Sequence, residues 1–248
     1  MGNAEQIEYW NGEAGKRWAQ EDDTMARLLH PISDALIAHA AVANYHSALD
    51  IGCGGGSQSV MLAQAMGPGT RVVGIDISAP MLAVAKDKAA DTTHKGAAME
   101  FVQADASTHA FEPGAFDLVF SRFGVMFFDD PVAALANTRS GMQTSGLLAF
   151  CSRPPLKVND WTRIPLQAAM QHVQAPAPAD PLAPGPFAFS DPERVRSVLQ
   201  DSGCHDINVQ AHGTPMRFGK TETLQQSVRE LAMIGPVARL LAEQPPEV

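Results

Sequence analysis

A glycine-rich loop that directly follows a short apolar run is the segment best suited to chemistry. Residues 46–61 read HSALDIGCGGGSQSVM, so the apolar run ends near Asp50 and glycines occupy positions 52, 54, 55 and 56. A loop of this kind between a buried strand and a helix presents backbone N–H groups and a helix N-terminus to a ligand. Glycine also permits positive φ and close approach of the backbone to that ligand. The segment therefore predicts a cofactor-binding loop.

Two cofactor templates compete for this loop. The dinucleotide pattern Gly-x-Gly-x-x-Gly, aligned on Gly52 and Gly54, places its third glycine at Ser57, where close packing of helix and strand requires a glycine. An acidic residue followed by x-Gly-x-Gly-x-Gly fits at every position, from Asp50 to Gly56. This second spacing resembles motif I of the class I S-adenosylmethionine-dependent methyltransferases, in their small-molecule branch (types 11 and 25).

The resemblance continues after the next expected strands and implies S-adenosyl-L-methionine as cofactor, with S-adenosyl-L-homocysteine as product. Asp76 stands where the family has an acid that binds the ribose hydroxyls, a bidentate task for a carboxylate. Asp105 stands where the family has an acid near the adenine amino group. Asp50 is interpreted as supporting the loop and the cofactor's ammonium group. The other cofactor contacts that the resemblance implies are Cys53, Ile77, Met81, Ala106, Ser121, Phe123 and Trp18.

Methyl transfer from a sulfonium needs mainly alignment and a dry pocket, because the cofactor is already activated. A general base is required only where the nucleophile keeps its proton. His30 and His172 are the candidate bases, since both could face the pocket. We expect no metal ion, because the cysteines lack Cys-x-x-Cys spacing and the histidines lack a His-Glu-x-x-His pattern.

The acceptor is expected to be a small molecule enclosed by the flanking segments. Arg122 and Phe127 are the candidate substrate contacts. The phenylalanine-rich run after the fourth strand suits a partly apolar or aromatic acceptor, and Arg122, Arg153 or Arg163 would suit a carboxylate on it. The sequence leaves open whether O, N or C accepts the methyl group.

The elements that must position these residues alternate along the chain. Helical segments are expected between apolar runs that read as strands, and the alternation predicts an α/β fold with a doubly wound, Rossmann-like, mostly parallel sheet. The strands are expected at residues 47–51, 71–76, 99–103, 116–121 and 146–151, and the helices between them at 57–66, 79–90 and 131–141.

Four regions follow from this reading. Residues 1–45 form an N-terminal helical cap, with helices at 4–20 and 24–43, the second kinked or split at Pro31. Residues 46–152 form the cofactor-binding core, and the Pro-rich residues 153–190 form an insertion or lid after the fifth strand, with a short helix near 162–173. Residues 191–248 form a helix–strand–helix unit that completes the sheet, with its strand at 205–216 and its last helix at 221–242.

The seventh, antiparallel strand that is usual in the resembling family has no counterpart after the expected sixth strand. We interpret this as a truncated form of the family's fold. The sixth strand would then have a bare edge, which favours homodimerisation or aggregation.

Composition narrows the classes of partner. The formal net charge is −9 and lysine and arginine are dispersed, so the basic footprint of a nucleic-acid binder is missing. No run of 18 apolar residues and no signal-peptide core occur, and three scattered cysteines suit a reducing compartment. We expect a cytoplasmic protein with no nucleic-acid or membrane partner.

Two other functions stay open. An NAD(P)-dependent oxidoreductase on a related fold is disfavoured by Ser57 and by the lack of a Tyr-x-x-x-Lys pair, because the only tyrosines are Tyr9 and Tyr45. A non-catalytic module that binds S-adenosylmethionine would carry the same motifs, since a fold alone does not establish turnover.

Overall fold

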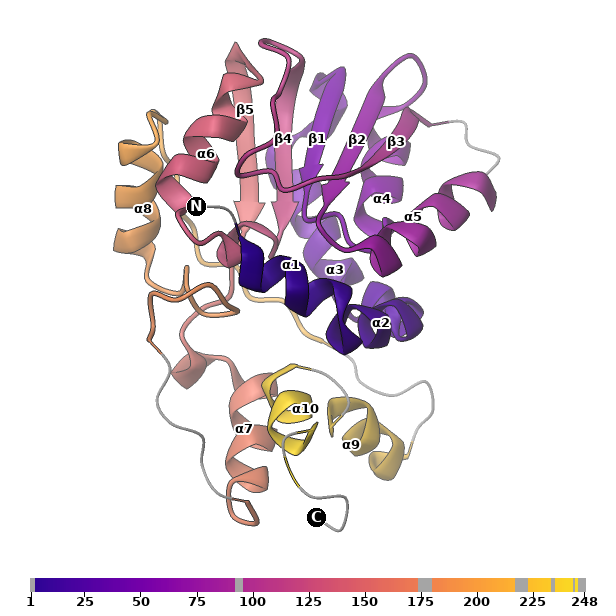
Figure 1. The fold of residues 1–248 in the computed structure, drawn as a ribbon, viewed down its shortest axis with the longest axis vertical. Helices are drawn as coiled ribbons and strands as arrows, with labels where there is room; N and C mark the ends of the chain where they lie inside the picture. Colours follow the sequence, from indigo (N-terminus) through magenta and orange to yellow (C-terminus); the bar gives the residue numbers. More distant parts are fainter. Residues whose placement is uncertain are drawn as a thin grey trace.

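A five-stranded parallel sheet forms the centre of the molecule. The computed structural model describes residues 3–91, 96–173, 180–216, 223–232, 235–242 and 244. Within this part the strand order is β3-β2-β1-β4-β5 and every neighbouring pair is parallel (Figure 1). The α/β doubly wound fold expected from the sequence is confirmed. The strands are β1 (Ser47–Ile51), β2 (Arg71–Asp76), β3 (Ala98–Gln103), β4 (Phe116–Arg122) and β5 (Met142–Cys151).

Helices alternate with the strands, and two of them start as their sequences predict. The side chains of Asp130 and Asp191 accept hydrogen bonds from the first turns of α6 and α8, each of which has a proline at its first position. The helices are α1 (Ala4–Asn11), α2 (Glu13–Gln20), α3 (Asp22–Ala40), α4 (Ser57–Met66), α5 (Ala79–Asp91), α6 (Pro131–Ser140), α7 (Asp160–Ala169), α8 (Pro192–Asp201), α9 (Leu224–Ala232) and α10 (Gly235–Ala242).

The two faces of the sheet have separate apolar cores. Ala48 and Leu118 belong to the core that includes residues of α3 and α4. Leu49 and Val119, their neighbours along the strands, belong to the core that includes residues of α6 and α8. Successive side chains of a strand point to opposite faces, so each short apolar run supplies both cores.

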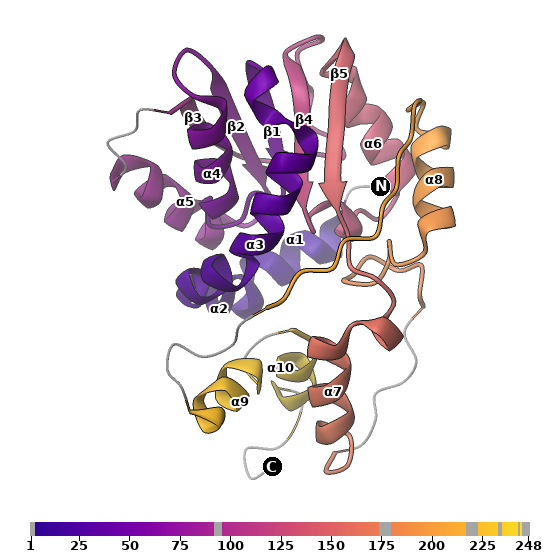
Figure 2. The same cartoon turned by 180° about the vertical axis from the view of Figure 1, so that it is seen from behind.

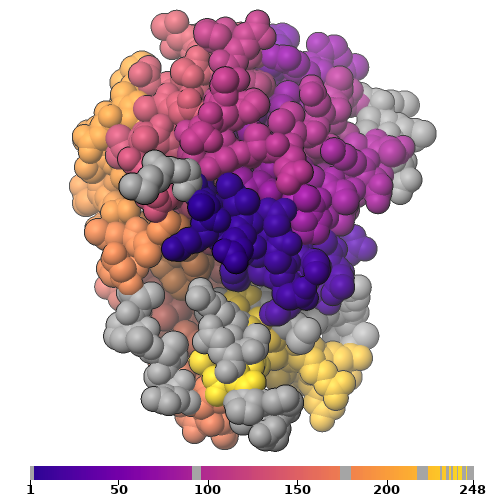
Figure 3. All heavy atoms as spheres, viewed as in Figure 1, coloured from indigo at the N-terminus to yellow at the C-terminus, as the bar shows by residue number. Residues whose placement is uncertain are grey.

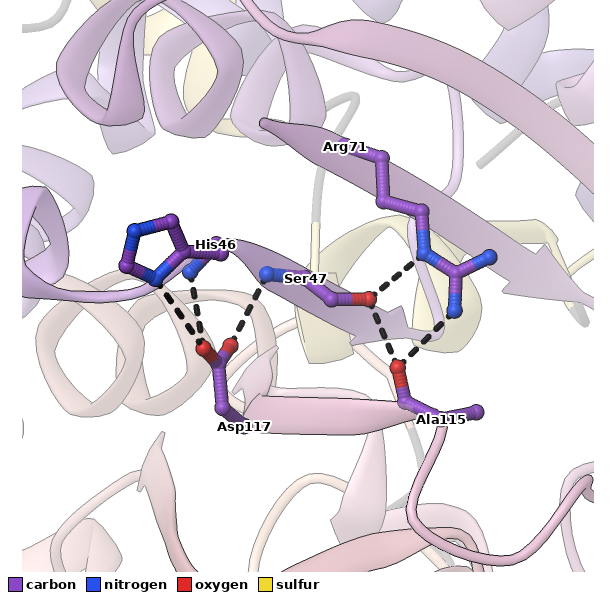
Figure 4. A network of polar contacts seen from close by, with 5 residues as sticks. All are labelled: His46, Ser47, Arg71, Ala115 and Asp117. Carbon is purple, nitrogen blue, oxygen red and sulfur yellow. Dashed lines mark hydrogen bonds and ion pairs between the residues drawn. The ribbon is translucent and has the colours of Figure 1, made fainter. Parts of the chain in front are cut away.

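A polar network holds together the amino ends of three strands, at the edge of the sheet opposite the glycine loop (Figure 4). Asp117 accepts the backbone N–H groups of His46 and Ser47 at 2.9 and 2.8 Å. Arg71 Nε donates to Ser47 Oγ at 2.7 Å, and its Nη2 donates to the carbonyl of Ala115 at 2.8 Å. These bonds fix the register of β1 against β2 and β4 at the amino ends of the strands. The glycine loop lies at their carboxyl ends.

Helices gather at the carboxyl ends of the strands. In Figures 1 and 2, α1 and α2 cross these ends, and α7, α9 and α10 form a group beyond them. Figure 3 shows the N-terminal helices on the molecular surface, next to the central part of the chain. Both flanking regions therefore lie on the side where open α/β sheets bind ligands.

Several helix predictions need correction. The helix expected over 4–20 is two helices, because Gly12 between them has the extended backbone angles φ −84° and ψ −154°. The helix expected to be kinked or split at Pro31 is not split, because Asp22–Ala40 form the single helix α3 with Pro31 inside it. The last helix, expected over 221–242, appears as α9 and α10, and residues 221–222 and 233–234 lie outside the described part.

The strand expected at 205–216 is wrong. These residues have no sheet pairing, so β5 is the last paired strand among the described residues. Figure 2 shows the segment running past β5, and Ile207 and Val209 pack against the apolar core. A positive φ of 55° at Asp206, together with Gly213 and Pro215, disfavours a continuous ladder, since proline lacks the N–H donor.

We expect Asp117→Ala to destabilise the protein by about 1–3 kcal/mol, because two backbone donors at the start of β1 lose their acceptor. Urea unfolding of the variant measures this change. Glu112→Ala, an exposed acid in the preceding turn, is the matched control and should change stability little. Equal losses for the two variants would contradict a role of Asp117 in fixing the strand register.

Candidate active site

The loop after β1 takes a conformation that its glycines make accessible. Gly52, Gly54 and Gly56 have φ values of 66°, 55° and 77°, a region that side chains with a Cβ rarely adopt. A Cβ at Gly52 would lie 2.8 Å from the Cα of Gly124, in the turn after β4. Glycine at position 52 therefore lets the loops after β1 and β4 approach each other closely.

Asp50 is fully buried beneath the loop. Its Oδ1 accepts from Gln58 Nε2 at 2.7 Å and its Oδ2 accepts from the Ser59 hydroxyl at 2.6 Å. Burial raises the pKa of Asp50 to about 6, and the hydrogen bonds from Ser59 and Gln58 oppose this shift. Asp50 thus holds the loop to the first turns of α4.

Asp76 ends β2 beside the same loop. Its Oδ2 accepts the N–H of Gly54 at 2.8 Å, and its Oδ1 accepts the N–H of Ser78 at 2.8 Å. Burial raises the pKa of Asp76, while these backbone donors act in the opposite direction. Each carboxylate oxygen can accept more than one hydrogen bond, so the pair of oxygens retains capacity for a ligand.

Asp105 follows β3 and binds the start of the chain. Its Oδ1 accepts from the Asn3 side chain at 3.2 Å and from the Ser107 hydroxyl at 2.7 Å, and its Oδ2 accepts the N–H of Asn3 at 3.2 Å. Asn3 is buried and also accepts the N–H of Asp129 at 2.8 Å. A side-chain amide therefore occupies the carboxylate that the sequence assigns to the adenine amino group.

The end of α1 binds the turn after β2. Asn11 Nδ2 donates to the carbonyl of Ile77 at 2.9 Å, and Asn11 Oδ1 accepts the N–H of Ala79 at 3.0 Å. The Ser78 hydroxyl donates to the carbonyl of Trp10 at 2.7 Å. The sequence did not predict roles for Asn3, Asn11 and Ser78, because their hydrogen-bond partners are distant in the chain. The local signal available was Asn11, an asparagine at the end of an amphipathic helix.

A partly buried ion pair connects α3 to the glycine loop. Lys88 on α5 pairs with Asp22 at the start of α3 and also donates to the Ser57 hydroxyl at 2.6 Å. A Cβ at Gly55 would lie 1.8 Å from an oxygen of Asp22, so this glycine makes the contact sterically accessible. The N-terminal cap is therefore attached at two places: α3 contacts the glycine loop, and α1 binds the turn after β2.

The end of β4 contains an unusual backbone conformation. Phe123 has φ 67°, which is rare for a residue with a bulky side chain and marks a strained position. Ser121 before it is fully buried, donates to the carbonyl of Ile51 at 2.9 Å and accepts the N–H of Gly124 at 3.2 Å. Arg122 extends to α3, where its Nη1 donates to the Ser33 hydroxyl at 2.7 Å.

The remaining residues expected to contact the cofactor differ in how deeply they are buried. Met81 lies beside the loop, since a Cβ at Gly54 would be 3.2 Å from its Cε. Cys53 is buried against Gly74 of β2, and burial raises the pKa of its thiol well above the usual range. Ala106 is part of the apolar core, with Ile77 half-buried at the end of β2. The thiol of Cys53 is thus unsuited to act as a nucleophile.

Aromatic rings from both sides of the site are in contact. The Trp10 ring lies edge-on to Trp18 at 5.8 Å and to Phe127 at 5.6 Å between ring centroids. Trp18 also packs against the apolar cluster of α3. This places Trp18 of the N-terminal cap and Phe127 of the turn after β4 in one aromatic group.

Both candidate bases are exposed. His30 is exposed on α3 and its Nδ1 lies 2.9 Å from Asp34 Oδ2. His172 is exposed just after α7. No contact between either ring and the residues above occurs within the described part, so the catalytic role of both histidines stays a prediction.

Two broader features complete the description. In the part of the chain that the structure describes, no helix has the length and apolar character needed to cross a bilayer. Over the same residues, no group of three histidine, cysteine or acidic side chains is arranged to hold a metal ion.

Comparison with known proteins supports the interpretation of this edge. Residues 49–150 match the family model described as "Methyltransferase domain", a range that holds the glycine loop, Asp76, Asp105 and the end of β4. Residues 49–150 of the chain are therefore similar to a methyltransferase domain.

Three curated relatives illustrate the range of this family. Nocamycin O-methyltransferase of Saccharothrix syringae is 28% identical over 185 residues, which cover 71% of this chain and 65% of that protein. Demethylmenaquinone methyltransferase of Thermus thermophilus is 37% identical over 107 residues, 43% of this chain and 47% of that protein. Malonyl-[acyl-carrier protein] O-methyltransferase of Pseudescherichia vulneris is 27% identical over 224 residues, 84% of this chain and 85% of that protein. The chain thus spans less than two thirds of the length of the first two relatives.

A solved structure supports the fold. A protein of Methanococcus maripaludis, provisionally assigned as an S-adenosyl-L-methionine-dependent methyltransferase, has a TM-score of 0.54 at 20% identity. The match covers 76% of this chain and 84% of that one. It supports the Rossmann-like architecture and carries no information on the acceptor.

We expect the buried Asp50 to make the stability of this protein depend on pH. The folded protein binds the Asp50 proton more tightly than the unfolded chain, because the pKa rises from 3.8 to about 6. Stability therefore falls as pH rises between these values, by on the order of 2–3 kcal/mol.

Urea unfolding of the wild type and Asp50→Asn at pH 4, 5, 6 and 7 tests this expectation. The wild type should lose stability relative to Asp50→Asn between pH 4 and pH 6. Asp87→Ala, which removes an exposed acid on α5, should keep the wild-type profile. Parallel profiles for wild type and Asp50→Asn would contradict the raised pKa of Asp50.

Proposed function

We propose that the protein transfers the methyl group of S-adenosyl-L-methionine to a small-molecule acceptor by in-line displacement. One observation carries the proposal: the carboxylate of Asp76 accepts the N–H of Gly54, so the expected ribose-binding acid and the glycine loop form one unit. Asp105 follows β3, which pairs with β2 at the same sheet edge.

Each part of the cofactor has a partner in this proposal. The loop of Gly52, Gly54 and Gly56 holds the amino acid end, with Asp50 as its buried support. Asp76 binds the ribose hydroxyls, and Asp105 binds the adenine amino group once the Asn3 amide has left it. Ile77, Met81 and Ala106 flank the adenine, and Trp18 and Phe123 flank the methionine end.

Two expected contacts act indirectly in this proposal. The Ser121 hydroxyl bonds the ends of β1 and β4 together and supports the turn that holds Phe123. Cys53 supplies a small buried side chain inside the loop. Both residues therefore shape the cofactor site through the backbone.

The chain's own contribution to the reaction is alignment and exclusion of water. A sulfonium methyl group is activated before it binds, so a site that holds donor and acceptor in line accelerates transfer without covalent catalysis. The aromatic group of Trp10, Trp18 and Phe127 provides an apolar wall for this purpose. Phe127 contacts the acceptor in this proposal.

The remaining proposals concern the setting of the protein. The negative net charge and dispersed basic residues support a small-molecule partner rather than a nucleic acid. The three free cysteines support a cytoplasmic location. The unpaired outer edge of β5 among the described residues supports a homodimer as the alternative to a monomer.

A thermal shift experiment tests the cofactor. S-adenosylhomocysteine at about a hundred times its Kd should stabilise the protein by about 2.7 kcal/mol, and NAD should give no shift. Stabilisation by NAD alone would overturn the proposal. Binding of S-adenosylhomocysteine without transfer of labelled methyl to any of a metabolite panel would support the non-catalytic alternative.

We expect Asp76→Ala to weaken S-adenosylhomocysteine binding about a hundredfold, because the ribose loses its bidentate acceptor and Gly54 loses its partner. Isothermal titration calorimetry measures the affinity. Asp87→Ala, which removes an exposed carboxylate on α5, is the control and should bind like the wild type. Equal affinities for both variants would exclude Asp76 as the ribose contact.

We expect His172→Ala to lower turnover with little change in cofactor affinity, if the acceptor keeps its proton until transfer. His30→Ala is the second variant, and His39→Ala, also on α3, is the control. Labelled methyl transfer at saturating cofactor measures turnover. Turnover equal to wild type in the first two variants removes both histidines as bases.

A further inference from the structure

Arg153 is a buried charge with no acidic partner among the residues that the structure describes. Its residue is only 8% exposed, and within the same part of the chain its Nε and Nη1 atoms have no hydrogen-bond partner. Burial lowers the pKa of Arg153 to about 10, and the only charged or ionisable group with a resolved effect on it is the Cys151 thiol. Buried guanidinium groups are normally paired, because an unpaired one loses its hydration without compensation.

Two aromatic rings hold the guanidinium in place. Its Cζ lies 5.1 Å from the centroid of the Phe123 ring and 4.9 Å from the centroid of the Trp161 ring. Phe123 is the strained residue at the end of β4, and Trp161 is in the first turn of α7. Arg153 is therefore held between the carboxyl edge of the sheet and the α7 helix, beside the residue that the proposed function places at the methionine end of the cofactor.

The surroundings of this pair of rings are apolar. Phe123 and Trp161 both pack against Met25, Leu28 and Leu29 of α3, and so does Trp18. An anion that entered here would leave water and meet a cation already stripped of its hydration, where charge-assisted hydrogen bonds are strong. The stacked rings also fix the guanidinium, so little side-chain freedom is lost when it binds.

The other two arginines that the sequence offers already have polar partners, although Nε of Arg122 has none among the described residues. Arg163 is bonded to Asp160 at 2.6 Å and to Gln167 at 3.0 Å on the exposed side of α7. Arg122 donates to the buried hydroxyl of Ser33. Of these three residues, only Arg153 combines a fixed guanidinium with two buried donors that lack acceptors.

We propose that Arg153 binds a carboxylate of the methyl acceptor, so that the enzyme's substrate is a carboxylic acid held beside Phe123. This inference rests on the proposed function for the identity of the acceptor. The carboxylate of the cofactor is a second source of the same chemistry. It is less well placed, because the glycine loop follows β1, and β4 lies between β1 and β5, which Arg153 follows.

Calorimetry with a charged ligand and its neutral isostere tests the proposal. Benzoate and benzamide suit the two flanking rings and differ in charge. Each is titrated into wild type, Arg153→Met, Arg153→Lys and the control Arg163→Met, with and without S-adenosylhomocysteine. We expect wild type and Arg163→Met to bind benzoate at least tenfold more tightly than benzamide. Arg153→Met should lose that preference, and Arg153→Lys should keep part of it.

A parallel titration separates the two sources of carboxylate. S-adenosylhomocysteine carries the amino acid group and 5′-methylthioadenosine lacks it. Arg153→Met should bind both as the wild type does. A loss of affinity for S-adenosylhomocysteine alone would assign Arg153 to the cofactor and overturn its assignment to the acceptor.

The melting temperature of Arg153→Met distinguishes a binding role from a structural one. Removing an unpaired buried charge should leave the melting temperature of the free protein unchanged or raise it. A marked decrease, with the benzoate preference also lost in Arg153→Lys, would make Arg153 a packing residue. Equal affinity of wild type for benzoate and benzamide would overturn the proposal. A benzoate preference in a wild type that fails to bind S-adenosylhomocysteine would overturn only the proposed function.

Discussion

The carboxyl ends of β1, β2 and β4 meet within hydrogen-bonding distance, and the candidate site depends on this convergence. The carbonyl of Ile75 accepts the N–H groups of Gly52 and Cys53, and Asp76 accepts the N–H of Gly54. On the other side, Gly52 is in close contact with Gly124. Because neighbouring parallel strands end at the same edge, three loops that are far apart in sequence form one surface. The positive φ angles of the glycines follow from this close approach.

The charged side chains near the carboxyl edge of the sheet differ in whether they have hydrogen-bond or ion-pair partners. Asp50 is buried and Asp76 and Lys88 are half-buried, and each has hydrogen-bond or ion-pair partners within the protein. Those interactions hold the loop, and their polar atoms are satisfied without a ligand. Arg153 is the contrast, since its buried Nε and Nη1 have no partner among the described residues. An unsatisfied charge opposes folding, so its retention beside the aromatic rings is consistent with selection for binding.

The N-terminal helices contact the site through side chains whose partners could not be predicted from the pattern of strands in the sequence. Asn3 binds the acid after β3, Asn11 binds the turn after β2, and Asp22 pairs with Lys88 of α5. The cap therefore contacts the same loops that the proposed cofactor would contact. In the described structure Asn3 binds Asp105, so the adenine contact that we propose for this acid competes with Asn3 for the same carboxylate.

The sequence by itself determined the alternation of elements, the parallel sheet, the glycine loop and the acids that follow β2 and β3. These features depend on local patterns: apolar runs, helix caps and glycine spacing act over a few residues. Only the tertiary structure decided the rest. It showed that 205–216 pairs with no strand, that Ser121 faces inward, that the candidate histidines are exposed, and that Arg153 is stacked between Phe123 and Trp161. Burial and long-range contacts decide such features, because the partners of a residue depend on which distant segments pack against it. The spacing of residues along the chain does not determine this packing.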